Sequence, residues 1–75
     1  MTTKKKDKVL SDIGNRIRLL REEKVLSQQD LAALCNFEKS NLSRLEAGRT
    51  NPTIVTLYKI SQALGISLSE LIDLD

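Results

Sequence analysis

Residues 26–48, LSQQDLAALCNFEKSNLSRLEAG, decide the fold of this chain. Within them, apolar residues recur at helical intervals on both sides of Asn36, a residue type that tolerates the left-handed conformation that ends a helix. Because only about three residues join the two segments, the helices must cross closely, and Ala32 supplies the small side chain for that contact. Leu42 and Leu45 then hold the second helix in place. The stretch predicts a helix-turn-helix.

Capping residues predict further helices on both sides of this motif. Ser27, Thr53 and Ser67 are suitable helix N-caps. Glu70 completes a capping box with the last of these, and Gly65 is a natural stop. The sequence therefore predicts an all-α, compact domain without strands. Its five expected helices are 9–24, 28–35, 39–47, 54–64 and a short segment after residue 67.

Residues 1–8 and 9–75 differ in pattern. The first eight are polar and charged without periodicity, so the sequence predicts a disordered basic tail before a single domain. With 75 residues, 40% of them hydrophobic and 3% aromatic, the chain fits a small aliphatic core. No apolar run approaches the roughly 18 residues that span a bilayer, and no signal segment follows the basic start. We therefore expect a cytoplasmic protein without a membrane partner.

The missing residue types limit the chemistry. The chain has no histidine, no tryptophan and one cysteine, Cys35. This composition excludes a disulfide within the chain, a zinc site and a histidine-activated nucleophile. We therefore expect no catalytic residue, no metal and no cofactor, and hence no enzyme. Cys35 is either a redox sensor or, as its place on an apolar helix face favours, a buried inert thiol.

The distribution of charge is more informative than the net charge of +2. Lysine and arginine gather in the N-terminal half, whereas residues 70–75 are acidic and apolar. The lysines of residues 4–8 either contact DNA phosphates or a minor groove, or form a solvated end. The two ends of the chain are therefore predicted to meet different partners.

Polar side chains form a stripe along the second helix of the motif, opposite its leucines. The stripe consists of Lys39, Ser40, Ser43 and Arg44. An α-helix fits the major groove of DNA, where such a stripe faces the base edges. Because arginine can bind guanine through two hydrogen bonds, we expect Arg44 and Lys39 to contribute most of the discrimination. The stripe is either a solvated polar helix face or, as the surrounding helix-turn-helix pattern favours, a set of four base-reading residues for a double-stranded DNA partner.

Two segments resemble the XRE family of phage repressors and Cro. They are LSQQDLA at 26–32 and SNLSRLEAG at 40–48. The resemblance implies a repressor-like DNA-binding domain in which the second helix of the motif is the recognition helix. It also implies that Arg21 and Glu46 form a structural ion pair between the first and third helices. The residues that it places at the DNA backbone are Gln28, Asn41, Arg49 and Thr50.

The last helix carries more apolar side chains than so short a segment buries in its own domain. Leu68 is expected to complete the core. The remaining apolar side chains would form a self-complementary patch of Leu71, Ile72 and Leu74. A two-fold homodimer through this patch would place two recognition helices about 34 Å apart, one turn of DNA, on a pseudo-palindromic operator.

The resemblance implies a sequence-specific transcriptional regulator, which represses by blocking RNA polymerase or activates by contacting it. Similarity to stand-alone regulators makes an autoregulatory controller of a restriction–modification system one specific hypothesis. The alternative is a protein-interaction module, such as an antitoxin that neutralises a partner protein through the apolar patch. The two hypotheses differ in whether the polar stripe or the apolar patch is required for activity.

Overall fold

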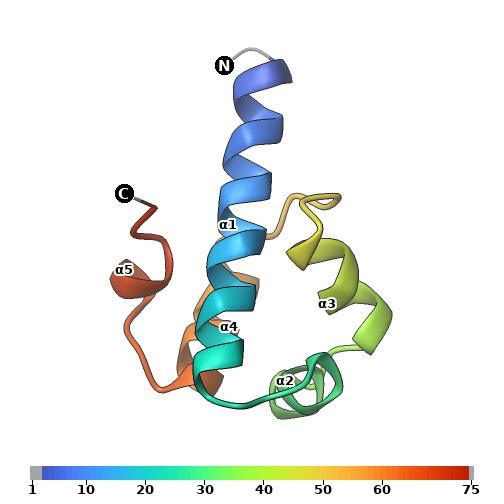
Figure 1. Cartoon of the computed structure of the whole chain (residues 1–75), viewed down its shortest axis with the longest axis vertical. Helices are drawn as coiled ribbons and strands as arrows, with labels where there is room; N and C mark the ends of the chain where they lie inside the picture. Colours follow the sequence, from blue (N-terminus) through green and yellow to red (C-terminus); the bar gives the residue numbers. More distant parts are fainter. Residues whose placement is uncertain (1–2, 75) are drawn as a thin grey trace.

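The computed structural model of this chain describes residues 3–74, and all of the regular structure in that range is helical. Figure 1 shows a long first helix, with the shorter helices packed around its C-terminal half. The helices are α1 (Thr3–Glu23), α2 (Gln28–Cys35), α3 (Lys39–Glu46), α4 (Ile54–Leu64) and α5 (Leu68–Leu71). The predicted all-α, five-helix fold is confirmed, and α2 and α4 have the bounds that the sequence predicts.

The first helix begins earlier than the sequence predicts. α1 starts at Thr3 rather than at residue 9, so residues 3–8 are helical where a disordered tail was expected. Lysine has a good intrinsic helix propensity, and the Lys8 ammonium lies 2.8 Å from the Asp12 carboxylate one turn later. These local terms extend the helix without any apolar periodicity. Residues 1 and 2 of the expected tail lie outside the described residues.

Local side-chain hydrogen bonds fix the starts of α2 and α5. The Ser27 hydroxyl accepts a hydrogen bond from the Asp30 amide at 3.0 Å, and the Asp30 carboxylate accepts one from the Ser27 amide at 3.0 Å. That backbone hydrogen bond lowers the pKa of Asp30. Ser67 and Glu70 form the same capping box at the start of α5. The caps that the sequence predicts at these two helices are confirmed.

Within residues 3–74, two residues other than glycine adopt the left-handed conformation and end helices. Asn36 has φ 58°, as the sequence predicts, and its turn is closed by the Phe37 amide, which donates to the Ala32 carbonyl at 2.8 Å. Val25, just after α1, also has φ 58°. A β-branched side chain is strained in this region, and Val25 is 89% exposed. Only the first of these stops carries a recognisable sequence signal.

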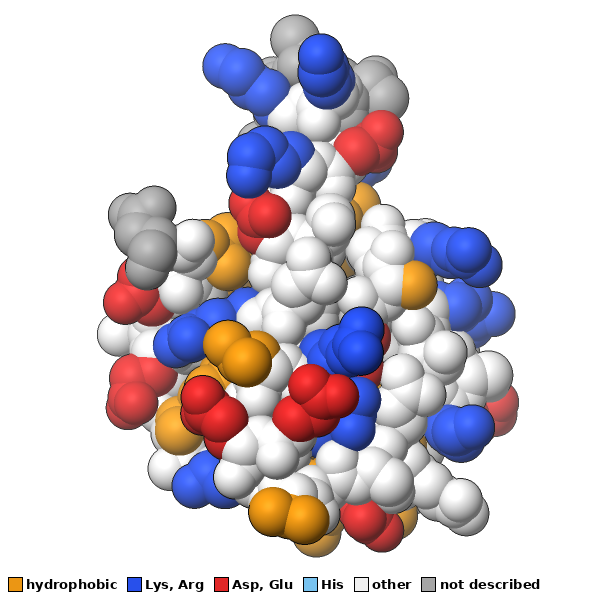
Figure 2. Space-filling view, viewed as in Figure 1, with side chains coloured by type: hydrophobic (Ala, Val, Ile, Leu, Met, Phe, Trp, Pro, Cys, Tyr) orange, Lys and Arg blue, Asp and Glu red, His pale blue; other side chains and the backbone are white. Residues whose placement is uncertain are grey.

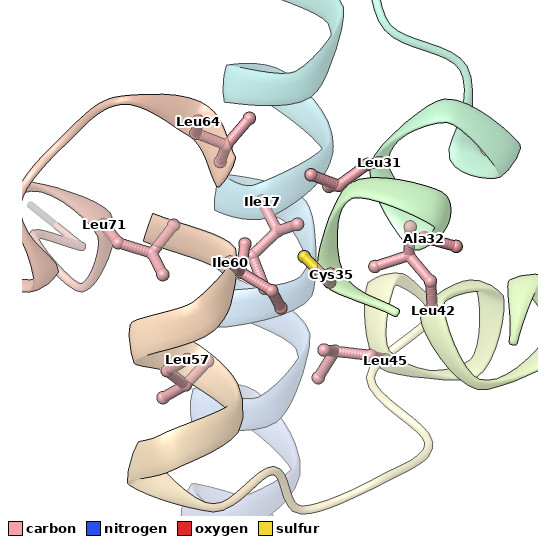
Figure 3. Packing of buried hydrophobic residues seen from close by; sticks show 10 residues of the cluster. All are labelled: Ile17, Leu31, Ala32, Cys35, Leu42, Leu45, Leu57, Ile60, Leu64 and Leu71. Atoms are coloured by element: carbon pink, nitrogen blue, oxygen red, sulfur yellow. The ribbon is translucent and has the colours of Figure 1, made fainter. Parts of the chain in front are cut away.

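An aliphatic core joins all five helices (Figure 3). Leu71 is fully buried and points from α5 toward Ile60 of α4. The prediction that Leu71 belongs to an exposed apolar patch is therefore wrong. Leu68 and Leu71 are three residues apart and share the inward face of this single helical turn. The buried apolar residues are Ile17, Leu31, Ala32, Cys35, Leu42, Leu45, Leu57, Ile60, Leu64 and Leu71.

α1 and α3 cross with their backbones in contact. A Cβ atom at Gly14 of α1 would lie 2.4 Å from the carbonyl oxygen of Glu46 and 2.6 Å from that of Leu45. Glycine inside a helix costs about 1 kcal/mol relative to alanine. Gly14 therefore lowers the intrinsic stability of α1, but it allows the close crossing that positions α3.

We predict that Gly14→Ala destabilises the protein, because backbone atoms of α3 must move to admit the methyl group. The free energy of unfolding should fall by about 1–3 kcal/mol, as for other overpacked sites. Helix propensity alone would give a gain of up to about 1 kcal/mol. Urea unfolding distinguishes the two signs, and the exposed Asn15→Ala in the same helix is the matched control. A Gly14→Ala protein at least as stable as the wild type would contradict the backbone contact.

Candidate nucleic-acid interface

α3 turns three side chains into the protein and the others outward. Leu42, Leu45 and Glu46 are 1%, 4% and 6% exposed. The side chains on its exposed face are Lys39, Ser40, Asn41, Ser43 and Arg44. Figure 2 shows several Lys and Arg side chains on the side of the molecule where α3 lies, and acidic side chains on the side of α5. The exposed face of α3 is therefore a polar, positively charged surface.

The four side chains predicted to read bases all lie on this exposed face. The Arg44 guanidinium donates a hydrogen bond to the side-chain oxygen of Asn41, three residues earlier in α3. Asn41, which the resemblance places at the DNA backbone, thus orients the Arg44 side chain. Two of the predicted DNA-contacting residues are therefore joined to each other by a hydrogen bond.

A buried ion pair ties α1 to α3. Arg21 Nε lies 2.7 Å from Glu46 Oε2, and Arg21 Nη2 donates to Glu46 Oε1 at 3.0 Å. Arg21 and Glu46 are 8% and 6% exposed. The hydrogen bonds to Glu46 raise the pKa of Arg21 above its ordinary value. The two residues that the sequence pairs thus form a bidentate contact whose charges face each other rather than the solvent.

The same ion pair reaches α2 and the turn before it. Arg21 Nη1 donates to the Leu26 carbonyl at 2.7 Å, and Gln28 Nε2 donates to Glu46 Oε1 at 3.0 Å. Gln28 is half-buried at the start of α2. The family resemblance implies a DNA-backbone contact for this glutamine but not its hydrogen bond to Glu46. One amide proton of Gln28 is thus committed to the protein, and its side chain has a fixed direction.

The loop that follows α3 carries the last two predicted backbone contacts. Arg49 is exposed, and its amide donates to the Arg44 carbonyl at 2.9 Å, which holds the loop against the end of α3. Thr50 is half-buried and lines a cleft of about 290 Å³ together with Asn41. Both loop residues therefore lie next to the exposed face of α3.

The C-terminal apolar surface contains a residue that the sequence analysis missed. Ile72 and Leu74 are each 39% exposed, and Leu19 of α1 is 51% exposed. Leu19 and Leu74 line the same cleft of about 350 Å³. Arg16 Nη2 donates to the Glu70 carbonyl at 2.8 Å and so holds the end of α5 against α1. The sequence contains one signal that Leu19 is exposed. It lies off the helical stripe that the other apolar residues of α1 form.

Cys35 lies in the core rather than at this interface. It is 6% exposed, and its sulfur lies 3.8 Å from the Lys59 carbonyl oxygen. Burial raises the pKa of the Cys35 thiol, although the nearby Lys59 charge lowers it. Because the thiolate is the reactive form, these surroundings favour an inert thiol.

Two other kinds of site have no candidate within residues 3–74. No group of three or more His, Cys, Asp or Glu side chains in that range could hold a metal ion. None of the helices in the same range has the length and apolar character that crossing a membrane requires.

A family model described as helix-turn-helix matches residues 17–71. The uncharacterized HTH-type transcriptional regulator y4dJ of Sinorhizobium fredii is 47% identical over 60 residues, which cover 80% of this chain and 78% of the relative. Control protein C.MunI of a Mycoplasma species is 46% identical over 59 residues, which cover 77% of this chain and 80% of the relative.

Solved structures of similar proteins share the fold. The restriction-modification controller protein C.AhdI from Aeromonas hydrophila superposes with a TM-score of 0.81 at 39% identity, over 83% of this chain and 94% of C.AhdI. SinR, a master regulator for biofilm formation, solved in complex with DNA, gives 0.76 at 42% identity, over 81% of this chain and 98% of that one. These relatives favour a transcriptional regulator over a protein-interaction module.

We predict that Glu46→Gln destabilises the protein strongly, because it leaves the buried Arg21 charge without its partner. Breaking a buried ion pair on one side costs about 3–5 kcal/mol, and the retained hydrogen-bonding capacity of glutamine places the loss near the lower end. Urea unfolding measures the change in the free energy of unfolding.

Glu22→Gln is the matched control for this substitution. It removes the same charge from the exposed pair that Glu22 forms with Arg18 at 3.5 Å. An exposed pair contributes less than about 1 kcal/mol, so this variant should be almost as stable as the wild type. Equal losses in the two variants would mean that the buried pair does not anchor α3.

Proposed function

This chain belongs to the helix-turn-helix family, and we propose that it is a sequence-specific transcriptional regulator that binds double-stranded DNA in the cytoplasm. In this proposal α3 enters the major groove and its exposed stripe reads the base edges. Nothing in the proposal requires a chemical reaction, a cofactor or a metal ion.

The observation that carries the proposal is the division of α3 into two faces. Its apolar side chains and Glu46 are buried, so the helix has one fixed orientation on the domain. Its other face carries exposed polar and cationic side chains, which are the types that hydrogen-bond to bases and phosphates. A rigidly seated helix with such a face fits the major groove, which is wide enough to admit it.

We assign base reading to the four exposed residues of the stripe and positioning to their neighbours. Arg44 and Lys39 provide the strongest discrimination, and Ser40 and Ser43 read bases less selectively. Because Asn41 holds Arg44, it contributes to the aim of the guanidinium as well as to backbone contact. The residues assigned to the DNA backbone are Gln28, Asn41, Arg49 and Thr50.

We propose that two copies bind one operator as a homodimer. Leu71 is part of the core, so the apolar surface offered to a second copy consists of Leu19, Ile72 and Leu74. A two-fold dimer across this surface would leave the α3 face of each copy free for a pseudo-palindromic site, because the two surfaces lie on different sides of the molecule.

Controller of a restriction–modification system is a specific form of this function. The similarity of this chain to C.MunI and C.AhdI supports this form of the function, because the matched region covers most of the length of both proteins. Bound at its operator, the dimer would repress transcription by blocking RNA polymerase or activate it by contacting the enzyme. In vitro transcription from the selected site distinguishes these two effects.

We predict that selection from random duplex DNA with the full chain enriches a two-fold symmetric site. On that site, Arg44→Ala should weaken binding by about 1–3 kcal/mol, because a bidentate contact to a base is lost. On a scrambled duplex it should have little effect. Arg49→Ala, the matched control, should weaken binding to both duplexes and reduce the dependence of affinity on salt.

Either of two results would contradict this function. Absence of any enriched sequence would mean that the protein is not a specific regulator. Equal weakening of the selected and the scrambled duplex by Arg44→Ala would mean that Arg44 binds phosphate rather than a base.

We also predict that Leu74→Asp weakens the dimer, because association would bury an unpaired charge. The dimer dissociation constant, measured by sedimentation equilibrium, should rise at least about tenfold. Leu34→Asp is the matched control, since Leu34 is 62% exposed on α2, a helix that lies on a different side of the molecule from α5 (Figure 1). A dimer that weakens equally in both variants, or in neither, would contradict this interface.

A further inference from the structure

The N-terminal end of α1 extends beyond the rest of the domain and is rich in lysine. Figure 1 shows α1 continuing past the other helices at this end, and Figure 2 shows Lys side chains on it. Residues 4–8 contain four lysines and one aspartate, a net charge of +3 (4 − 1), and all five are exposed. This segment lies outside the region that the family model matches.

The chain that leaves α3 crosses α1 just below this segment. A Cβ atom at Gly48 would lie 2.9 Å from Cα of Ser11, so loop and helix are in backbone contact there. Asn51, three residues further along the loop, lines a cleft together with Lys6 and Leu10. Lys6 is five residues before the crossing point, about 7.5 Å along the helix axis. It therefore adjoins the loop that carries Arg49 and lies beyond that loop as seen from α3.

Lys6 and Lys8 point to different sides of α1. Lys6 shares its cleft with the loop after α3. Lys8 forms an ion pair with Asp12 at 2.8 Å and lines the cleft on the side of Leu19 and the C-terminal segment. Two residues of the same type, two positions apart, are therefore placed toward the proposed DNA surface and toward the proposed dimer surface respectively.

We propose that Lys6 contacts a DNA phosphate just outside the base pairs that α3 reads. This inference rests on the proposed function and adds a backbone contact to it. The helical α1 holds Lys6 beside Asn51, two residues after Arg49 in the same loop, so we expect a duplex bound at α3 and this loop to continue past Lys6. Asp7, the one acidic residue of the segment, repels the same phosphates and limits the affinity gained.

The experiment measures binding of the full chain to the selected duplex in two lengths. The short duplex ends at the outermost base pair of the site, and the long duplex carries a full helical turn of flanking DNA on each side. Lys6→Gln should lower affinity for the long duplex about fivefold per bound protomer, and reduce the salt dependence by about 0.9 in log–log slope per protomer. On the short duplex it should have little effect. Asp7→Asn should raise affinity for the long duplex only.

Lys59→Gln is the matched control, because it makes the same substitution at an exposed lysine of α4 that belongs to neither the proposed DNA surface nor the proposed dimer surface. It should leave affinity for both duplexes almost unchanged, and circular dichroism should show that each variant retains its helices. Equal losses for Lys6→Gln and Lys59→Gln, or a Lys6→Gln loss that persists on the short duplex, would overturn the flanking contact while wild-type binding stays specific. A wild type that prefers no duplex would instead overturn the proposed function, and this inference with it.

Discussion

The close crossing of α1 and α3 is the constraint on which the rest of the structure depends. Gly14 lets the two backbones touch at Glu46, and the side chain of that same glutamate binds Arg21, about two helical turns further along α1. α3 has only eight residues, too few for a stable isolated helix. Its position and orientation therefore depend on tertiary contacts, namely the backbone contact and buried ion pair with α1 and the packing of Leu42 and Leu45 in the core.

The ion pair also connects the two helices of the motif. Gln28 binds Glu46, and Arg21 binds the Leu26 carbonyl. The same ion pair therefore holds both the start of α2 and the end of α3. A buried ion pair is weak evidence for stability, since its desolvation offsets much of its attraction. Its effect here is geometric, because bidentate contacts fix direction. A DNA-reading surface needs this fixed geometry more than it needs additional stability.

The same long helix separates two surfaces with different chemistry. The α3 side and the N-terminal turns of α1 are rich in lysine and arginine, whereas the C-terminal segment presents apolar and acidic residues. Arg16 holds the Glu70 carbonyl and so ties α5 to the helix that supports α3.

The sequence by itself determined the bounds of α2 and α4, the starts of α3 and α5, the turn at Asn36 and the outward stripe of α3. Caps such as Ser27 and stops such as Gly65 act on backbone groups within a few residues, so local sequence suffices to place them. Only the tertiary structure decided that Leu71 is buried while Leu19 is exposed, and that Gln28 binds Glu46. Burial and long-range hydrogen bonds depend on which helices meet and at what angle, and helical periodicity does not contain that information.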